Sequence, residues 1–238
     1  MLDAEATPRA RRHDANGERI LDTALQLVAD GGLEALSMAR LAAAVDYTPG
    51  ALYRYFDSKD ALLSRLVARV LGEIDELLGQ ALARVPRRAA PLCRVFALAH
   101  GYRTFATRHP HRFALLTMTM AAPRVLLQAP ADAGPVVAKI MATLQPLASA
   151  VVDATTARQL LPGDAALRTL CIFASLQGTL LLRKQVRYAP EGLDQETLAN
   201  AALRALLIGW GATPAGVDAA LRRVTRLGAL PDSPGGTA

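Results

Sequence analysis

Residues Ser37–Lys59, SMARLAAAVDYTPGALYRYFDSK, are predicted to form two short helices joined by a tight turn and followed by the start of a third helix. Ser37 is a suitable N-cap, because its hydroxyl can accept a hydrogen bond from a backbone N–H that the first turn leaves unpaired. Asp46 lies where that helix must end, and aspartate tolerates a left-handed backbone. Thr48 can cap the second helix, and Pro49 suits its first position, where a missing N–H costs nothing.

The apolar residues of this stretch follow helical spacing. Leu41, Ala42 and Val45 fall on one face of the first helix, and Leu52 and Phe56 form an inward i,i+4 pair in the second. Polar and aromatic side chains remain for the outer faces. This is the helix-turn-helix layout, in which the second helix enters the major groove of DNA.

The same stretch resembles the DNA-binding domain of the tetracycline-repressor (TetR) family, over about residues 16–66. The matching parts, in order, are ERILDTALQLVADGG, SMARLA, TPGALYRYF and SKDALL. Two positions depart from the family pattern: Asp46 replaces the usual glycine, and Tyr47, which can tilt the recognition helix, replaces a small aliphatic residue. The alternative interpretation is an ordinary three-helix bundle in which Tyr53 and Tyr55 are packing residues.

The rest of the chain also shows helical periodicity, with Gly and Pro between the periodic blocks. We therefore predict an all-α protein of about nine to ten helices. The resemblance implies the same number of helices, arranged as an N-terminal three-helix helix-turn-helix domain joined to a larger helical ligand-binding and dimerisation domain. The expected parts are a flexible basic tail (1–15), the DNA-binding domain (16–66), the effector-binding and dimerisation domain (67–228) and a disordered tail (229–238).

The helix boundaries follow from the caps, glycines and prolines. The expected helices span 17–30, 37–45, 48–56, 58–84, 90–108, 111–120, 136–155, 164–188, 193–210 and 213–227. Residues 121–135 are predicted to be a loop with at most one helical turn. Pro146 is predicted to kink its helix, because it removes a backbone hydrogen bond.

Contacts to the DNA backbone are expected at two helix ends and at three family positions. The helix N-termini opened by Ser37 and Thr48 present unpaired N–H groups that suit a phosphate. The resemblance implies backbone contacts from the tyrosine of the LY pair, the aromatic residue two positions later and the lysine of the SK pair. These are Tyr53, Tyr55 and Lys59.

Base reading is expected from the two short helices. Arg40 and Arg54 can each make a bidentate contact with guanine, or bind a phosphate instead. Gly50 permits close approach of the backbone, and Pro49 and Ala51 can contact a thymine methyl. The complete base-reading set is Ala39, Arg40, Pro49, Gly50, Ala51 and Arg54.

Net charge is a weak indicator of DNA binding in this chain. The 238 residues carry a formal charge of +6, but residues 1–65 hold 8 Lys and Arg against 10 Asp and Glu. DNA binding must therefore be argued from the positions of particular groups. Arg9, Arg11 and Arg12 concentrate positive charge in the leading tail, which either follows the DNA or is disordered.

An effector pocket is expected among the middle helices. The candidate residues are Phe96, His100, Arg103, Phe113, Leu116, Met120, Phe173 and Gln177. Because only 5% of residues are aromatic, a mostly aliphatic cavity for a hydrophobic small molecule is expected, with His100 or Arg103 available for an anionic head group. Aromatic and Met residues serve the core of a helical bundle equally well.

The resemblance implies a dimer interface on the last two long helices. A dimer is expected because a single helix-turn-helix reads only half of a palindrome. Small residues in the first of them permit close approach of a partner helix. The same apolar stripes can also form the core of one subunit. The candidate residues are Leu170, Ala174, Gly178, Leu181, Leu203, Leu206, Leu207 and Trp210.

Several other classes of function lack sequence support. The N-terminus has no apolar stretch typical of a secretory signal, and no apolar run reaches the ~18 residues of a membrane span. Cys93 and Cys171 lie in apolar helical patterns, which favours reduced thiols over a disulfide. No metal-ligand cluster, glycine-rich phosphate loop or nucleophile motif is present, so we expect no cofactor and no enzymatic activity. Glu73, Asp75 and Glu76 are expected to form a solvated face.

We therefore expect a cytoplasmic DNA-binding transcriptional regulator of the repressor type. It should bind a palindromic operator as a homodimer and be released by a hydrophobic small molecule; an activator fits the same residues. The alternatives are a helical interaction protein without a DNA role, which leaves the capped turn and LYRYF unexplained, and an enzyme, for which no motif is present.

Overall fold

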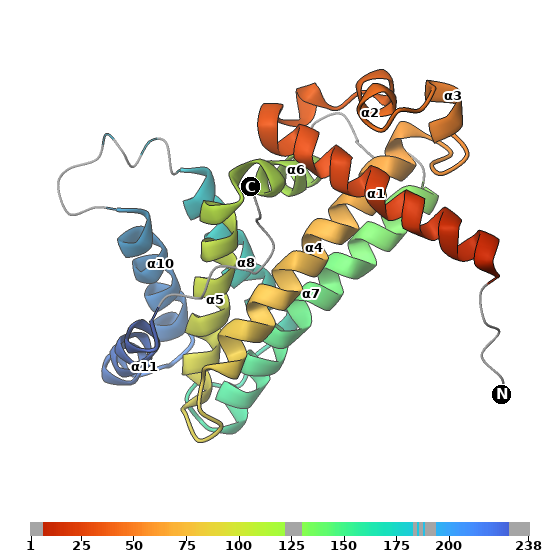
Figure 1. Ribbon diagram of the computed structural model, residues 1–238. Coiled ribbons are helices and arrows are strands. Elements are labelled where there is room, and N and C mark those ends of the chain that lie inside the picture. Colours follow the sequence, from red (N-terminus) through yellow and green to blue (C-terminus); the bar gives the residue numbers. More distant parts are fainter. Residues whose placement is uncertain (1–6, 122–129, 183–184, 186–187, 189–193, 229–238) are drawn as a thin grey trace. The chain divides into compact units, whose positions relative to one another are not determined.

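The computed structural model describes residues 7–121, 130–182, 185, 188 and 194–228, and every regular element in those residues is helical (Figure 1). The predicted all-α class is therefore confirmed. The elements are α1 (Pro8–Gly31), the 3₁₀ helix η1 (Leu33–Ala35), α2 (Met38–Ala44), α3 (Pro49–Leu52), α4 (Lys59–Ala83), α5 (Pro91–Arg108), α6 (Pro110–Ala121), α7 (Pro130–Thr156), α8 (Ala165–Leu181), α10 (Gln195–Gly209) and α11 (Pro214–Arg226).

The chain divides into two compact units. The first unit is Met1–Glu73 with Arg108–Ile140, and the second unit is Ile74–Thr107 with Met141–Ala238. The helices α4 and α7 each contribute residues to both units. This differs from the predicted division at residue 66, because α6 and the start of α7 fold with the helix-turn-helix.

In the first unit, α1 packs against η1, α2 and α6. Its inward face is apolar at helical spacing, so one stripe of the helix enters the core. Full burial of each large apolar side chain contributes about 1.5–3 kcal/mol, and such residues hold the short α2 and α3 in place. The buried set includes Ile20, Leu21, Leu25, Val28, Leu41, Leu52, Phe56, Leu62, Leu63 and Leu66.

The helix α1 begins at Pro8, whereas the sequence predicted a flexible tail to residue 15 and a helix from 17. Proline suits the first position of a helix, and the alanine and arginine residues that follow are strong helix formers. The Asn16 side chain also donates to the Tyr55 hydroxyl at 3.4 Å, which ties this end of α1 to the residues after α3. The extension places Arg11 and Arg12 on an ordered, exposed helical turn.

The helix α3 is shorter than predicted and ends at Leu52 rather than at residue 56. The next residues form a turn in which the N–H groups of Tyr55 and Phe56 both donate to the Leu52 carbonyl, at 2.9 and 3.0 Å. This turn brings Phe56 into the core and leaves Tyr53 exposed.

Two further boundaries differ from the predicted ones. The helix α7 begins at Pro130, inside the segment predicted to be a loop, and continues through Pro146 as one helix. Residues 122–129 of that predicted loop lie outside the described residues. The helix α8 ends at Leu181 rather than at residue 188. The remaining helix ends agree with the predicted ones within two residues.

By length and composition alone, the stretch Ala133–Thr156 of α7 meets the criterion for a membrane-spanning helix, which the sequence reading had not expected. A single such helix is weak evidence for a membrane span, since core helices of globular proteins meet the same criterion. Val136, Leu147 and Val151 of this stretch are buried against other parts of the chain.

In the second unit, most residues of α5 are buried. Gly101 permits a close approach, because a Cβ atom there would lie 3.3 Å from the Ala81 Cβ atom. An ion pair of 2.5 Å joins Arg94 of α5 to Asp153 of α7. These contacts fix α5, which carries three of the residues predicted to bind an effector.

The last two helices of the second unit are capped and joined to each other. Asp194 caps α10 by accepting from the Thr197 N–H, and Thr213 caps α11 by accepting from the Gly216 N–H. Arg204 of α10 pairs with Asp218 of α11 at 2.7 Å. The pKa of the Asp218 carboxyl is lowered by the hydrogen bond from Arg204.

Candidate DNA interface and effector cavity

The capped turn forms as the sequence predicts. The Ser37 Oγ atom accepts from the Arg40 N–H at 3.2 Å, and the Thr48 Oγ1 atom accepts from the Ala51 N–H at 3.3 Å. Asp46 has a φ of 58°, in the left-handed region that glycine usually occupies. The departure from the family glycine is therefore accommodated by the backbone, and both short helices keep their caps.

Most of the predicted DNA-contacting side chains lie at the surface. Ser37, Ala51 and Tyr55 are half-buried. In the described part of the chain, the side chains of Arg40, Arg54 and Lys59 form no ion pair with a carboxylate, so their charge is available to a ligand. The exposed set is Ala39, Arg40, Thr48, Pro49, Gly50, Tyr53, Arg54 and Lys59.

Tyr55 is held in a row of rings that the sequence did not reveal. Its ring stacks on His13 with centroids 4.5 Å apart, and on Tyr47 at 6.1 Å. The Arg19 guanidinium lies over the Tyr47 ring, 5.8 Å from the ring centre. Because Tyr55 accepts from Asn16, its own hydroxyl proton stays free to be donated to a phosphate.

Tyr47 is part of the same row of rings. Tyr47 replaces a small aliphatic residue of the family pattern, and its ring lies nearly parallel to Tyr55, at an interplanar angle of 17°. His13, in the part of α1 predicted to be a flexible tail, closes the row and contacts the Arg54 carbonyl at 3.3 Å. The first turns of α1 therefore support the residues that follow α3.

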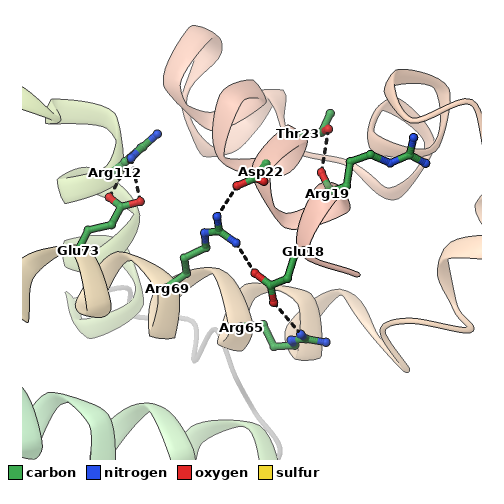
Figure 2. Close-up of polar contacts among 8 residues, drawn as sticks. All are labelled: Glu18, Arg19, Asp22, Thr23, Arg65, Arg69, Glu73 and Arg112. Carbon is green, nitrogen blue, oxygen red and sulfur yellow. Dashed lines mark hydrogen bonds and ion pairs between the residues drawn. The ribbon is translucent and has the colours of Figure 1, made fainter. Parts of the chain in front are cut away.

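Arginine–carboxylate pairs hold α1, α4 and α6 together in the first unit (Figure 2). Arg69 of α4 binds both Glu18 and Asp22 of α1. Arg112 of α6 donates to both carboxylate oxygens of Glu73, at 2.8 Å each. The prediction that Glu73 belongs to a solvated face was therefore wrong, because its half-buried carboxylate is paired with a residue 39 positions away.

His109 lies near the ion pair between Arg112 and Glu73. Burial lowers the pKa of His109, and the positive charge of Arg112 lowers it further, against the opposing effect of Glu73. The neutral imidazole is thus favoured at the start of α6.

A cavity of about 180 Å³ lies between α5, α10 and α11 in the second unit, and we name it the α5–α10–α11 cavity. It contains three residues of the predicted effector set. Its lining is Phe96, His100, Arg103, Glu196, Asn200, Leu221, Val224, Thr225 and Gly228.

The other residues of the predicted effector set do not line this cavity. Phe113 and Leu116 are buried in the first unit, where they belong to its core. The Phe173 ring packs edge-on against Tyr102 at 5.8 Å. Gln177 is half-buried, and its Oε1 atom has no hydrogen-bond partner among the described residues. The Met120 side chain lies outside the described ones.

Arg103 is the buried charge of the cavity, with 9% of its surface exposed. Its Nη1 atom donates to Asn200 Oδ1 at 2.9 Å, and its Nη2 atom lies 3.6 Å from a Glu196 oxygen. Burial lowers the pKa of Arg103, and the charges of Glu196 and Asp194 act in the opposite direction. Sequence reasoning found Arg103 but not Asn200 or Glu196, because nothing in the local pattern links α5 to a helix 97 residues later.

The exposed apolar residues of α8 form a stripe at helical spacing. This α8 stripe consists of Leu167, Leu170, Ala174, Gly178 and Leu181, all of them exposed. Leu170 exposes 45% of its surface and Leu181 59%. Four of the five residues were predicted to lie in a dimer interface.

The predicted interface residues of α10 divide into two groups. Leu203 and Leu207 expose 2% and 0% of their surface, so they belong to the core of the second unit rather than to an interface. Leu206 and Trp210 are half-buried. After the exposed Glu196 and Thr197 of its first turn, the exposed positions of α10 are small, namely Ala201, Ala205 and Gly209. Helical periodicity marked the apolar face of α10 but did not show that the chain's own α8 covers it.

Both cysteines are free, with Cys93 buried and Cys171 half-buried. Burial raises the pKa of the Cys93 thiol. Among the described residues, no group of three or more His, Cys, Asp and Glu side chains is placed to hold a metal ion.

Two family models match the chain. The model of bacterial regulatory proteins of the tetR family matches residues 20–66, and the model of the tetracyclin repressor-like C-terminal domain matches residues 95–206. Together they cover the helix-turn-helix and the helices from α5 to α10.

The HTH-type transcriptional repressor KstR of Rhodococcus jostii (strain RHA1) is 47% identical over 58 residues, which are 24% of this chain and 27% of that protein. KstR of Mycobacterium tuberculosis (strain ATCC 25618 / H37Rv) is 36% identical over 75 residues, or 32% of this chain and 33% of that protein. The chain therefore matches only about a third or less of the length of these curated relatives.

Solved structures share the fold over most of the chain. FadR of Bacillus subtilis in complex with stearoyl-CoA is 17% identical, with a TM-score of 0.63 over 81% of this chain and 98% of that one. AibR in complex with isovaleryl coenzyme A and operator DNA is 24% identical, with a TM-score of 0.55 over 80% of this chain and 97% of that one. With the two matching family models and the helix-turn-helix geometry, these findings show that the chain belongs to the tetR family of bacterial regulatory proteins.

Proposed function

We propose that this protein is a cytoplasmic transcriptional repressor that binds a palindromic operator as a homodimer and is released by a small hydrophobic molecule. The observation that carries the proposal is the capped helix-turn-helix with Arg40, Tyr53, Arg54 and Lys59 exposed. Three positive charges without carboxylate partners suit a polyanion, and phosphate contacts supply most of the affinity of such proteins for DNA.

The proposed DNA contacts divide into two kinds. Tyr53, Tyr55 and Lys59 follow α3 and are assigned to phosphates, since they carry one or a few donors and no geometry that distinguishes bases. Arg40 and Arg54 are assigned to base edges, because a guanidinium can donate twice to guanine O6 and N7. The helix N-termini at Ser37 and Thr48 are assigned to phosphates as well.

This division gives an expected result for two alanine variants. Lys59→Ala should weaken binding to every duplex by a similar factor. It should also reduce the slope of log affinity against log salt concentration by about 1, because one fewer counterion is released. Arg54→Ala should instead relax the preference at particular base pairs, with a loss of about 1–3 kcal/mol on the best sequence only. Fluorescence anisotropy against a panel of single-base operator variants measures both effects.

The control for this experiment is Arg226→Ala, which removes an exposed arginine from α11. It makes the same change in net charge and should leave affinity and base preference unchanged. A uniform loss of affinity in Arg54→Ala would assign Arg54 to a phosphate and contradict its role in base reading.

The homodimer is proposed from the α8 stripe. The small residues Ala174 and Gly178 allow two α8 helices to approach closely, and the exposed leucines on either side of them supply apolar surface to bury. The exposed small residues of α10 can extend this surface. The requirement for two recognition helices, one for each half of a palindrome, supports the same conclusion.

Release by an effector is proposed from the α5–α10–α11 cavity and from the relatives' ligands. FadR and AibR are described with bound acyl-coenzyme A molecules, and AibR also with operator DNA. A ligand releases DNA only by preferring a conformation that binds DNA less well. A coupling free energy of about 1–3 kcal/mol changes operator affinity roughly 5–150-fold. The helix α4 carries residues of both units and is therefore the proposed connection.

A further inference from the structure

The α5–α10–α11 cavity contains a buried cation whose donors are incompletely used. A guanidinium has five N–H donors. Among the described residues, the Asn200 Oδ1 atom is the one side-chain acceptor within hydrogen-bond distance of Arg103. The nearest Glu196 oxygen lies at 3.6 Å, which is an ion-pair contact but too long for a good hydrogen bond. The cavity therefore presents Arg103 N–H groups that no side chain of the described residues accepts, beside the apolar side chains of Phe96, Leu221 and Val224.

The two charged residues of the cavity differ in their exposure. Arg103 is buried, whereas 59% of the Glu196 side chain is exposed at the start of α10. A solvated carboxylate loses little when a ligand displaces it, while a buried guanidinium gains acceptors that water supplies poorly. The cavity thus favours an anionic ligand over a cationic amine. An amine would bring no additional acceptor for the N–H groups of Arg103.

We propose that the α5–α10–α11 cavity binds a small carboxylic acid, with the carboxylate on Arg103 in place of Glu196 and the hydrocarbon part against Phe96 and Val224. This proposal specifies the chemical class of the effector, so the role of the acid in regulation rests on the proposed function. Asn200 contributes a second donor, because its Oδ1 atom accepts from Arg103 and its Nδ2 group remains for the ligand.

The volume of the cavity limits the size of the acid. About 180 Å³ is well below the 300–1,000 Å³ of sites for drug-sized ligands. A free acid with a short aliphatic or aromatic group fits this space, and a whole acyl-coenzyme A does not. The ligand expected here is therefore smaller than the molecules bound by FadR and AibR.

The test uses butanoate, hexanoate and phenylacetate, each paired with its primary amide, and calorimetric titration of the full chain. At least one acid should bind with a Kd below about 10 mM, and about tenfold or more tightly than its amide, because charge-assisted hydrogen bonds are the stronger ones. Failure of all three acids to bind, or equal affinity for acid and amide, would overturn the proposal.

Two near-isosteric variants of the cavity should act in opposite directions. Glu196→Gln removes the competing carboxylate and should tighten acid binding several-fold, whereas Asn200→Asp places a carboxylate 2.9 Å from Arg103 and should weaken it about tenfold or more. Arg94→Gln, an α5 variant outside the cavity lining, should leave the affinity unchanged. The unliganded melting temperature of each variant verifies folding. An unchanged or weaker affinity in Glu196→Gln contradicts the site.

Operator binding is measured in the same samples, so that the site and its regulatory role fail separately. An acid that binds with the expected response to Glu196→Gln and Asn200→Asp, yet leaves operator affinity unchanged, supports the carboxylate site and refutes release by that ligand. An acid that releases the operator equally well from both variants refutes the site and leaves the proposed function intact.

Discussion

Replacing Leu170 and Leu181 together with aspartate is expected to convert the proposed homodimer into a folded monomer with little affinity for the operator. Both leucines are exposed in the single chain, at 45% and 59%, so the change costs its folding little. In a dimer that buries the α8 stripe, each aspartate would be desolvated without a partner, at a cost of several kcal/mol. Losing the second recognition helix should then reduce operator affinity by about 10²-fold or more.

Analytical ultracentrifugation and anisotropy on the same sample measure this result. The control replaces Ala215 and Ala219, two exposed residues of α11, with aspartate, which adds the same charge away from the α8 stripe. The control should stay dimeric and bind the operator with a loss of only a few-fold. If the protein with both Leu170→Asp and Leu181→Asp remains a dimer, the interface lies on a surface other than the α8 stripe.

The second large effect is expected at Phe56, whose ring fills the core beneath the helix-turn-helix. Phe56→Ala should destabilise the first unit by about 3–5 kcal/mol, because it removes a large, fully buried side chain and leaves a cavity. The Arg65 guanidinium, 5.3 Å from the ring centre, loses its contact as well. Chemical denaturation followed by a probe in the first unit measures the loss.

Tyr53→Ala is the matched aromatic control, three positions earlier and exposed at 49%. It should change the free energy of unfolding by less than about 0.5 kcal/mol, while weakening binding to all DNA sequences. The two variants therefore separate folding from DNA contact. Equal destabilisation by both changes would mean that Tyr53 is a packing residue, as in the ordinary three-helix bundle.

The parts of the fold that local chemistry determines were predictable from the sequence. Ser37, Thr48 and Pro49 specify two helix starts, and Asp46 specifies the turn between them, because each acts within a few residues of its partner. Amphipathic spacing then located nearly all of the helices. The start of α1 was missed because its stabilising contacts, such as the stacking of His13 on Tyr55, join residues 42 positions apart.

Tertiary contacts also explain the misassigned site residues. An apolar stripe indicates that a helix face is covered but not what covers it. Leu203 and Leu207 were therefore predicted to lie in a dimer interface, although the chain's own core buries them. Phe113 was assigned to the effector pocket because aromatic residues suit a cavity and a core equally. Asn200 and Glu196 carried no sequence signal, since polar residues on α10 are expected at its surface.

Recognition of an operator by the helix-turn-helix of this chain can be measured by titrating a labelled palindromic duplex from the DNA upstream of its gene. We predict binding of two chains per duplex, with an affinity at least 10³-fold above that for a scrambled duplex at physiological salt. Affinity should fall about 10³–10⁵-fold between 50 and 200 mM salt if roughly six to ten phosphates are contacted. Equal affinity for the palindrome and the scrambled duplex, or an affinity that does not change with salt, would show that the helix-turn-helix of this chain does not recognise an operator.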